Sequence, residues 1–157
     1  MNLSQQIAKH FREVYFGDNW TDVNLKDSLA DVTWEEATTQ IYACNTIATL
    51  LFHMNWYVIR VAKVLLGNPL EGHDKDSFAV PLVQSAENWA ALQATVFADA
   101  EGFANQIEQL PASKLEETFS EEKYGNYYRN IHGIIEHNHY HLGQIVLLKK
   151  ILRQLDN

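Results

Sequence analysis

The sequence has a single cysteine, Cys44, among its 157 residues. One cysteine cannot form an intramolecular disulfide, and disulfides are rare in reducing compartments such as the cytosol. Basic charge is also scarce: 12 Lys and Arg stand against 20 Asp and Glu, which gives a formal net charge of −8. Because nucleic acids and anionic membranes attract basic surfaces, we expect neither as the main partner of this protein.

No hydrophobic run in the sequence is long enough to cross a bilayer. The longest, such as the one around residues 47–52, fall well short of the roughly 20 residues that a spanning helix needs. Lys9, Arg12 and Glu13 interrupt the N-terminal segment, where a signal peptide would need an unbroken apolar stretch. We therefore expect a soluble, cytoplasmic protein.

The composition indicates a packed globule. Hydrophobic residues make up 46% of the chain and charged residues 20%, a balance that is typical of folded domains rather than of disordered segments. The length fits one domain with a single core, and we take residues 1–157 as that domain.

Apolar residues recur at helical spacing in four segments, and no alternating pattern of useful length predicts a strand. The second segment begins with a capping box, in which the Thr33 hydroxyl and the Glu36 carboxylate each bond a backbone amide. Its apolar stripe passes through Cys44, and Gly67 with the following Asn-Pro pair ends it. The four predicted helices cover residues 2–16, 34–66, 86–110 and 127–155.

Three further segments join the predicted helices. A connector follows the first helix, and we expect Trp20 and Leu25 to pin it to the rest of the protein. A polar loop over residues 70–81 follows the second helix, and a short helical turn that begins at Ser113 precedes the last helix. The predicted fold is therefore all-α: a four-helix bundle with a connector after the first helix and a short extra helical turn before the last.

One segment of the last predicted helix holds four of the seven histidines, namely His132, His137, His139 and His141. Since each helical residue advances by about 100°, His137 and His141 lie about 40° apart and fall in a gap of the inward apolar stripe. His132 and His139 point about 200° or more away from His137, where surface exposure or a subunit contact accounts for them. An i, i+4 pair of histidines is a standard way for one helix to offer two nitrogens to a metal, and hydrogen-bonded core histidines are the alternative.

A third metal ligand would have to come from another helix, and His53 is the candidate. It lies in an apolar stretch of the second predicted helix, at a depth where a charged imidazolium is costly, although a hydrogen-bonded core histidine is again the alternative. We expect His10 and His73 to be solvated. Asn138 stands where a zinc protease of the H-E-x-x-H type has its glutamate base, so that mechanism is not supported.

This order of motifs resembles the DinB-like, or YfiT-like, family of metal-dependent proteins. The resemblance rests on His53 in the second helix and on the pattern H-x-x-x-H-x-G-Q over residues 137–144, and it covers essentially the whole chain. It implies a four-helix bundle, often a homodimer, in which His53, His137 and His141 hold a divalent ion, typically nickel or zinc. Some members are S-transferases or isomerases that use low-molecular-weight thiols such as bacillithiol or mycothiol.

The resemblance predicts the metal ligands, but it does not predict a substrate. Three neutral imidazoles on two helices leave coordination positions open, as catalytic metal sites do, and Tyr57 and Gln144 are candidates for lining the pocket beside them. A metal-dependent transferase that joins a thiol co-substrate to a small electrophile is the first function considered. A metal-dependent hydrolase and a non-catalytic metal-binding stress protein are the alternatives, and the sequence leaves all three open.

Overall fold

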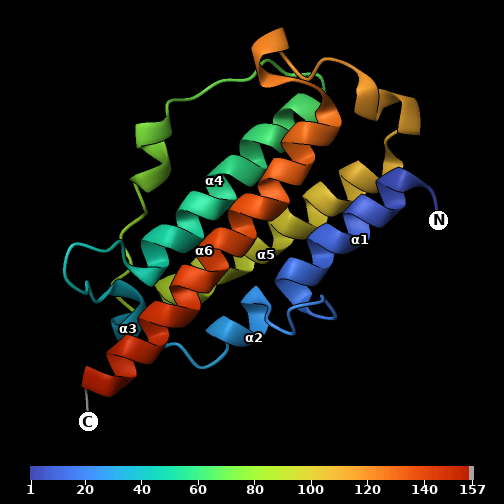
Figure 1. The fold of residues 1–157 in the computed structure, drawn as a ribbon. Coiled ribbons are helices and arrows are strands. Elements are labelled where there is room, and N and C mark those ends of the chain that lie inside the picture. The colour runs from blue at the N-terminus through green and yellow to red at the C-terminus, as the bar shows by residue number, and fades with distance from the viewer. Residues whose placement is uncertain (156–157) are drawn as a thin grey trace.

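The protein is described over residues 1–155 by a computed structural model, and most of that range is helical (Figure 1). Within those residues there are six α-helices, four of them long, and no strand beyond a single bridge between Thr118 and Asn126. The prediction of an all-α fold is therefore confirmed for the described part of the chain. The long helices are α1 (Leu3–Phe16), α4 (Ile47–Leu65), α5 (Ala86–Gln109) and α6 (Tyr127–Leu155). The short α-helices are α2 (Leu25–Leu29) and α3 (Trp34–Thr38), and the loops contain three 3-10 helices, η1 (Asp74–Phe78), η2 (Ala112–Glu116) and η3 (Glu122–Tyr124).

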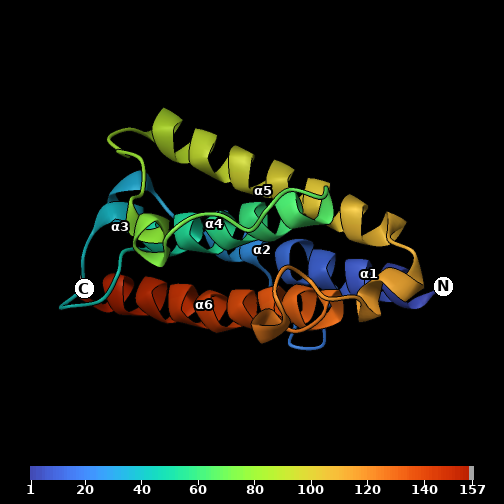
Figure 2. The same ribbon diagram turned by 90° about the horizontal axis from the view of Figure 1, so that it is seen from above.

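The four long helices lie side by side and enclose one core. Helix α1 packs against α5 and α6, and α4 packs against the same two helices, so that the contacts form a closed ring around the core. Figures 1 and 2 show this arrangement from two directions, with α4 and α6 adjacent in both. The α4–α6 contact matters most for function, because all the histidines expected to bind metal lie on these two helices.

Polar caps fix where several of these helices begin. The side chain of Ser85 accepts a hydrogen bond from the Asn88 amide and starts α5, as the sequence predicts. The predicted capping box is also present, since the Thr33 hydroxyl and the Glu36 carboxylate bond each other's backbone amides. Such caps satisfy amides that have no partner inside the helix, and each typically contributes about 1 kcal/mol.

The predicted second helix is wrong in one respect, because it is broken in two. Helix α3 ends at Thr38, residues 39–46 are not helical, and Thr46 caps the new helix α4. The Thr38 and Thr39 hydroxyls bond carbonyl oxygens of their own turn, which favours a stop at this point. Cys44, expected on the apolar stripe, is consequently exposed in the connection.

The connector between α1 and α2 is held differently from the prediction. Leu25 is completely buried, as expected, but the Trp20 side chain is 99% exposed and pins nothing. Asn19 performs that role instead: its side-chain amide donates to the carbonyl oxygens of Glu13 and Val23, and its oxygen accepts from Thr21. The connector is therefore held by hydrogen bonds from Asn19 to α1 and to its own backbone rather than by an aromatic anchor.

The predicted polar loop over residues 70–81 contains the 3-10 helix η1, which packs against α4. Ser77 of η1 is fully buried. His73, which immediately precedes η1, is exposed, as expected. The predicted turn near Ser113 is present as η2. Among the described residues, no helix combines the length and the apolar character that crossing a membrane requires.

Candidate metal centre

Three histidines from two helices meet at one point between α4 and α6. The Nε2 atom of His137 lies 3.0 Å from Nε2 of His53 and 3.1 Å from Nε2 of His141. His53 and His141 are buried, and His137 is half-buried. The structure thus brings together the three residues that the sequence singles out as metal ligands, and their geometry could hold one ion.

A hydrogen bond from η1 sets the tautomer of His53. The Ser77 hydroxyl donates its hydrogen to the carbonyl oxygen of Asp74, at 2.5 Å. The same hydroxyl oxygen lies 2.8 Å from Nδ1 of His53, and because its own hydrogen is already used it accepts one from that nitrogen. Nε2 of His53 therefore carries a free lone pair that faces the other two rings.

Gln144 does the same for His141. Its side-chain oxygen lies 2.6 Å from Nδ1 of His141, and an amide oxygen can only accept. Its amide nitrogen donates to the hydroxyl of Tyr140, which fixes the orientation of the group. Gln144 therefore acts as a hydrogen-bond acceptor behind a ligand, and it leaves the Nε2 lone pair of His141 free.

The three facing nitrogens cannot all satisfy one another through hydrogen bonds. Nε2 of His137 can donate at most one hydrogen, yet it has a lone pair on each side, from His53 and from His141. Nδ1 of His137 is buried and has no hydrogen-bond partner among residues 1–155. A cation between the rings would resolve the conflict, since two nitrogens at about 2.0–2.1 Å from one ion lie about 2.8–3.4 Å apart for ligand angles between a right angle and the tetrahedral angle.

Burial keeps these imidazoles neutral, as metal ligands must be. Loss of hydration, with a smaller contribution from the neighbouring His141, lowers the pKa of His53 and of His137 to about 4. Burial also lowers the pKa of His141. The lone pairs are therefore available near neutral pH without the loss of a proton.

Aromatic side chains hold the rings of the three histidines in place. Phe78 of η1 stacks on His53 with ring centroids 4.3 Å apart. Tyr57 meets both His53 and His137 edge-on, and Tyr140 does the same to His141. The Tyr57 hydroxyl donates to Asp74, and burial together with this carboxylate raises the pKa of Tyr57, so the phenol stays protonated.

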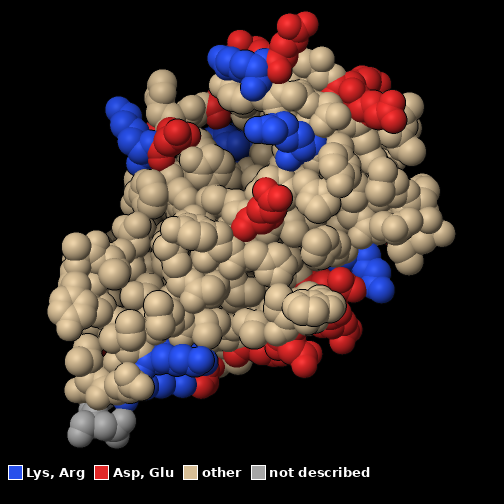
Figure 3. Space-filling view, in the orientation of Figure 1, with Lys and Arg blue, Asp and Glu red and all other residues tan. Residues whose placement is uncertain are grey.

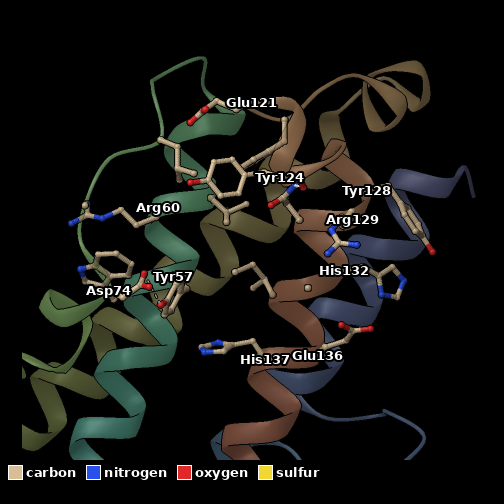
Figure 4. A pocket seen from close by; sticks show the side chains of 18 of the residues that line it. Tyr57, Arg60, Asp74, Glu121, Tyr124, Tyr128, Arg129, His132, Glu136 and His137 are labelled. Atoms are coloured by element: carbon tan, nitrogen blue, oxygen red, sulfur yellow. Dashed lines mark hydrogen bonds between the residues drawn. The ribbon is translucent and has the colours of Figure 1, made fainter.

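A cavity of about 990 Å³ lies beside His137, the one of the three histidines that lines it. His137 and Tyr57 line it, and its walls come from α4, from the N-terminal part of α6 and from the loops around residues 70–74 and 119–124. Figure 4 shows His137 at one end of this space with Tyr57 across from it, and Figure 3 shows a hollow on the same face of the protein. Gln144 is not part of the described lining, so of the two pocket candidates only Tyr57 lies there.

The remaining histidines of α6 lie away from this centre. His132 and His139 flank His10 of α1, with ring centroids 6.1 and 6.2 Å from it. Asn138, which replaces the glutamate of the zinc-protease pattern, is fully buried and donates to the hydroxyl of Tyr15. These residues join α6 to α1 and do not reach the three facing nitrogens.

Sequence reasoning missed Ser77 and Phe78, although they hold His53 from outside. Both lie 24 or more residues from His53 in the sequence, in a loop whose composition predicted only exposed polar residues. No periodic pattern links a loop to the helix face that it covers, so the contact appears only once the fold is known.

Comparisons of the chain with protein-family models, with curated proteins and with solved structures gave no match. The resemblance to the DinB-like family therefore stays a prediction. The candidate function has to be argued from the geometry of the centre itself.

Proposed function

We propose that this protein is a metal-dependent enzyme in which His53, His137 and His141 bind one divalent ion, nickel or zinc, in a DinB-like four-helix bundle. The observation that carries the proposal is the convergence of three Nε2 atoms, two of them fixed as acceptors by Ser77 and Gln144. An all-nitrogen, all-neutral ligand set suits borderline metals of this kind. With three protein ligands, at least one coordination position is left for a small molecule, as in catalytic sites.

The chemistry that the ion supplies at such a centre is Lewis-acid activation of a small nucleophile, either water or a thiol. The chain's own residues bind and orient the reactants. Tyr57, held protonated by burial and by Asp74, presents a hydrogen-bonding group beside His137 at the end of the cavity. We favour transfer of a thiol to a small electrophile, because a thiolate needs no general base to attack. A hydrolase is the second candidate.

The metal is tested by elemental analysis of protein purified without a histidine tag. His53→Ala, His137→Ala and His141→Ala should each reduce bound metal from about one ion per chain to almost none, because each removes one of three ligands. His132→Ala and His139→Ala are matched controls from the same helix and should retain the ion. Equal loss in both groups, with folding intact by circular dichroism, would show that the three facing nitrogens are not the site.

The reaction is tested by turnover with a low-molecular-weight thiol and an aryl halide. In this transfer the thiol loses its proton to solvent, the sulfur forms a bond to the ring carbon, the carbon–halogen bond breaks, and halide leaves with the bonding electrons. The metal-loaded protein should form the thioether faster than the His137→Ala variant does. Release of the corresponding phenol instead, with thiol unconsumed, would favour the hydrolase, and no turnover with metal bound would favour a non-catalytic metal-binding protein.

The substrate is proposed to be a small molecule that enters the cavity beside His137. The net charge of −8 argues against nucleic acid or an anionic membrane in that role. A homodimer and a cytoplasmic location stay predictions of the resemblance and of the composition. Light scattering tests the first of these.

A further inference from the structure

The outer nitrogen of His137 lacks the kind of partner that the other two histidines of the centre have. Nδ1 of His53 donates to the Ser77 hydroxyl, at 2.8 Å. Nδ1 of His141 donates to Gln144 in the same way, at 2.6 Å. Nδ1 of His137, by contrast, is buried and makes no hydrogen bond with any residue from 1 to 155. A neutral imidazole that binds a metal through Nε2 carries its hydrogen on Nδ1, so this atom needs an acceptor.

The side chain of Asn138 has the complementary need. Asn138 follows His137 on α6 and is fully buried, and its Oδ1 makes no hydrogen bond within residues 1–155 either. A buried amide oxygen that has lost water and found no donor destabilises the folded state, so proteins rarely leave one unpaired. A donor and an acceptor that both lack partners thus lie on neighbouring residues of one helix.

The amide of Asn138 acts on the His137 ring through its oxygen. Burial lowers the pKa of His137, and hydrogen bonding by the Asn138 side chain opposes this effect and raises it. A group that accepts from the charged ring raises the pKa of a histidine, whereas a donor lowers it. The oxygen of the amide is therefore a neighbour of this ring, although the two do not form a hydrogen bond of normal geometry.

Tyr15 of α1 holds the other end of the amide. Nδ2 of Asn138 donates to the Tyr15 hydroxyl at 3.0 Å, and both side chains are completely buried. The Tyr15 ring in turn packs against Phe11, with centroids 4.9 Å apart. The amide is thus braced from α1, and its oxygen is left for His137.

A second buried asparagine shows what a purely structural role looks like. Asn55 of α4 is buried, donates to Asp99 of α5 at 2.8 Å, and also has an Oδ1 without a partner among the described residues. It lies two residues from His53, but Nδ1 of that ring already bonds Ser77. Asn55 therefore matches Asn138 in burial and in its hydrogen bond to another helix, and it has no ligand to orient.

We propose that Asn138 is a positioning residue for His137: with an ion at the centre, Oδ1 of Asn138 accepts the hydrogen on Nδ1 of His137 and fixes the tautomer and rotation of the ring. The inference rests on the proposed function, because the group that is positioned is a metal ligand. Each of the three ligands then has a side-chain acceptor at Nδ1. The centre, whose ligands lie on α4 and α6, thereby depends on Tyr15 of α1 as well.

Zinc affinity, measured by competition with a chromophoric chelator, tests the proposal. Asn138→Leu keeps the size of the side chain and removes the acceptor, so the affinity should fall by about 10-fold or more. Asn55→Leu removes an equally buried asparagine from the same core and should bind zinc as the unaltered protein does. Asn138→Asp supplies two acceptor oxygens, one for His137 and one for the Tyr15 hydroxyl, and should restore the affinity. Circular dichroism checks that each variant is folded.

Proton NMR of the zinc-loaded protein reads the hydrogen bond itself. The hydrogen on Nδ1 of His137 should give a resolved signal, because a buried and bonded N–H exchanges slowly with water, and the signal should lie downfield of a free imidazole N–H. In Asn138→Leu it should move upfield, since the hydrogen has lost its acceptor. In Asn55→Leu it should stay in place.

Equal zinc affinity in Asn138→Leu and in the unaltered protein would overturn this inference and leave the proposed function intact. An equal loss in the two leucine variants would do the same, because it would show a general loosening of the core. The NMR signal of the unaltered protein keeps the test decisive even if Asn138→Leu does not fold, since a signal at the position of a free N–H refutes the bond. If the unaltered protein binds no zinc, the proposed function fails and this inference fails with it.

Discussion

Ser77 and Gln144 each occupy Nδ1 of one histidine, and this leaves the opposite nitrogens of His53 and His141 facing His137. Loss of a group that orients a metal ligand in this way typically lowers the metal affinity by 10-fold to 100-fold. The sequence predicted the three ligands because a four-residue spacing on one helix is visible in a single segment. It could not predict Ser77, whose contact joins segments 24 residues apart.

We expect Ser77→Ala to weaken metal binding by about 10-fold or more, because His53 loses the acceptor that fixes its tautomer. Competition with a chromophoric chelator measures the change. Ser120→Ala provides the control, since Ser120 is exposed and should bind metal as the unaltered protein does. An unchanged affinity in Ser77→Ala would mean that packing by Phe78 alone orients the ring.

Helix boundaries follow local chemistry where a cap is present. The sequence predicted α5 and α6 closely, because Ser85 and the long apolar stripe of α6 act within their own segments. It missed the break between α3 and α4, since apolar residues continue at helical spacing across residues 39–46. Ile41 is buried there although it is not helical, so the apolar spacing that predicts a helix continues through this segment. The threonine hydroxyls nevertheless end α3 before it.

The break gives Thr46 a role that a continuous helix would not. Its hydroxyl accepts from the Thr49 amide and caps α4, the helix that carries His53. We expect Thr46→Ala to lower the free energy of unfolding by about 1 kcal/mol, as measured by urea denaturation. Thr95→Ala, in the middle of α5 where alanine favours the helix, should be neutral or slightly stabilising. Equal effects of the two substitutions would argue for a helix that runs through residue 46.

Much of the core is built by helices that carry none of the three facing histidines. Large buried side chains, including Phe11, Tyr15 and Phe103, lie on α1 and α5 and pack against one another. We therefore expect the chelated protein to keep its helical fold. This outcome would separate a functional centre from a structural metal, whose removal unfolds the domain.

Metal should still stabilise the folded chain, because the unfolded chain lacks the site. With free ion at 100 times the dissociation constant the gain is about 2.7 kcal/mol, or a rise in melting temperature of about 5 to 10 °C for a domain of this size. Scanning calorimetry with and without zinc measures it. His137→Ala, which lacks the central ligand, should show no rise. A rise of the same size in that variant would place the stabilising ion elsewhere.

The 3-10 helix η1 covers His53 with Ser77 and Phe78 but belongs to none of the long helices. An ion can leave the centre on this side only after the loop has moved away from His53. The loop therefore bears on two properties of the centre. Ser77 contributes to affinity by orienting His53, whereas the covering position of Phe78 bears on how quickly an ion passes in or out on this side. Substitutions in the loop that keep Ser77 should thus change the rate of ion exchange more than the amount of ion bound at equilibrium.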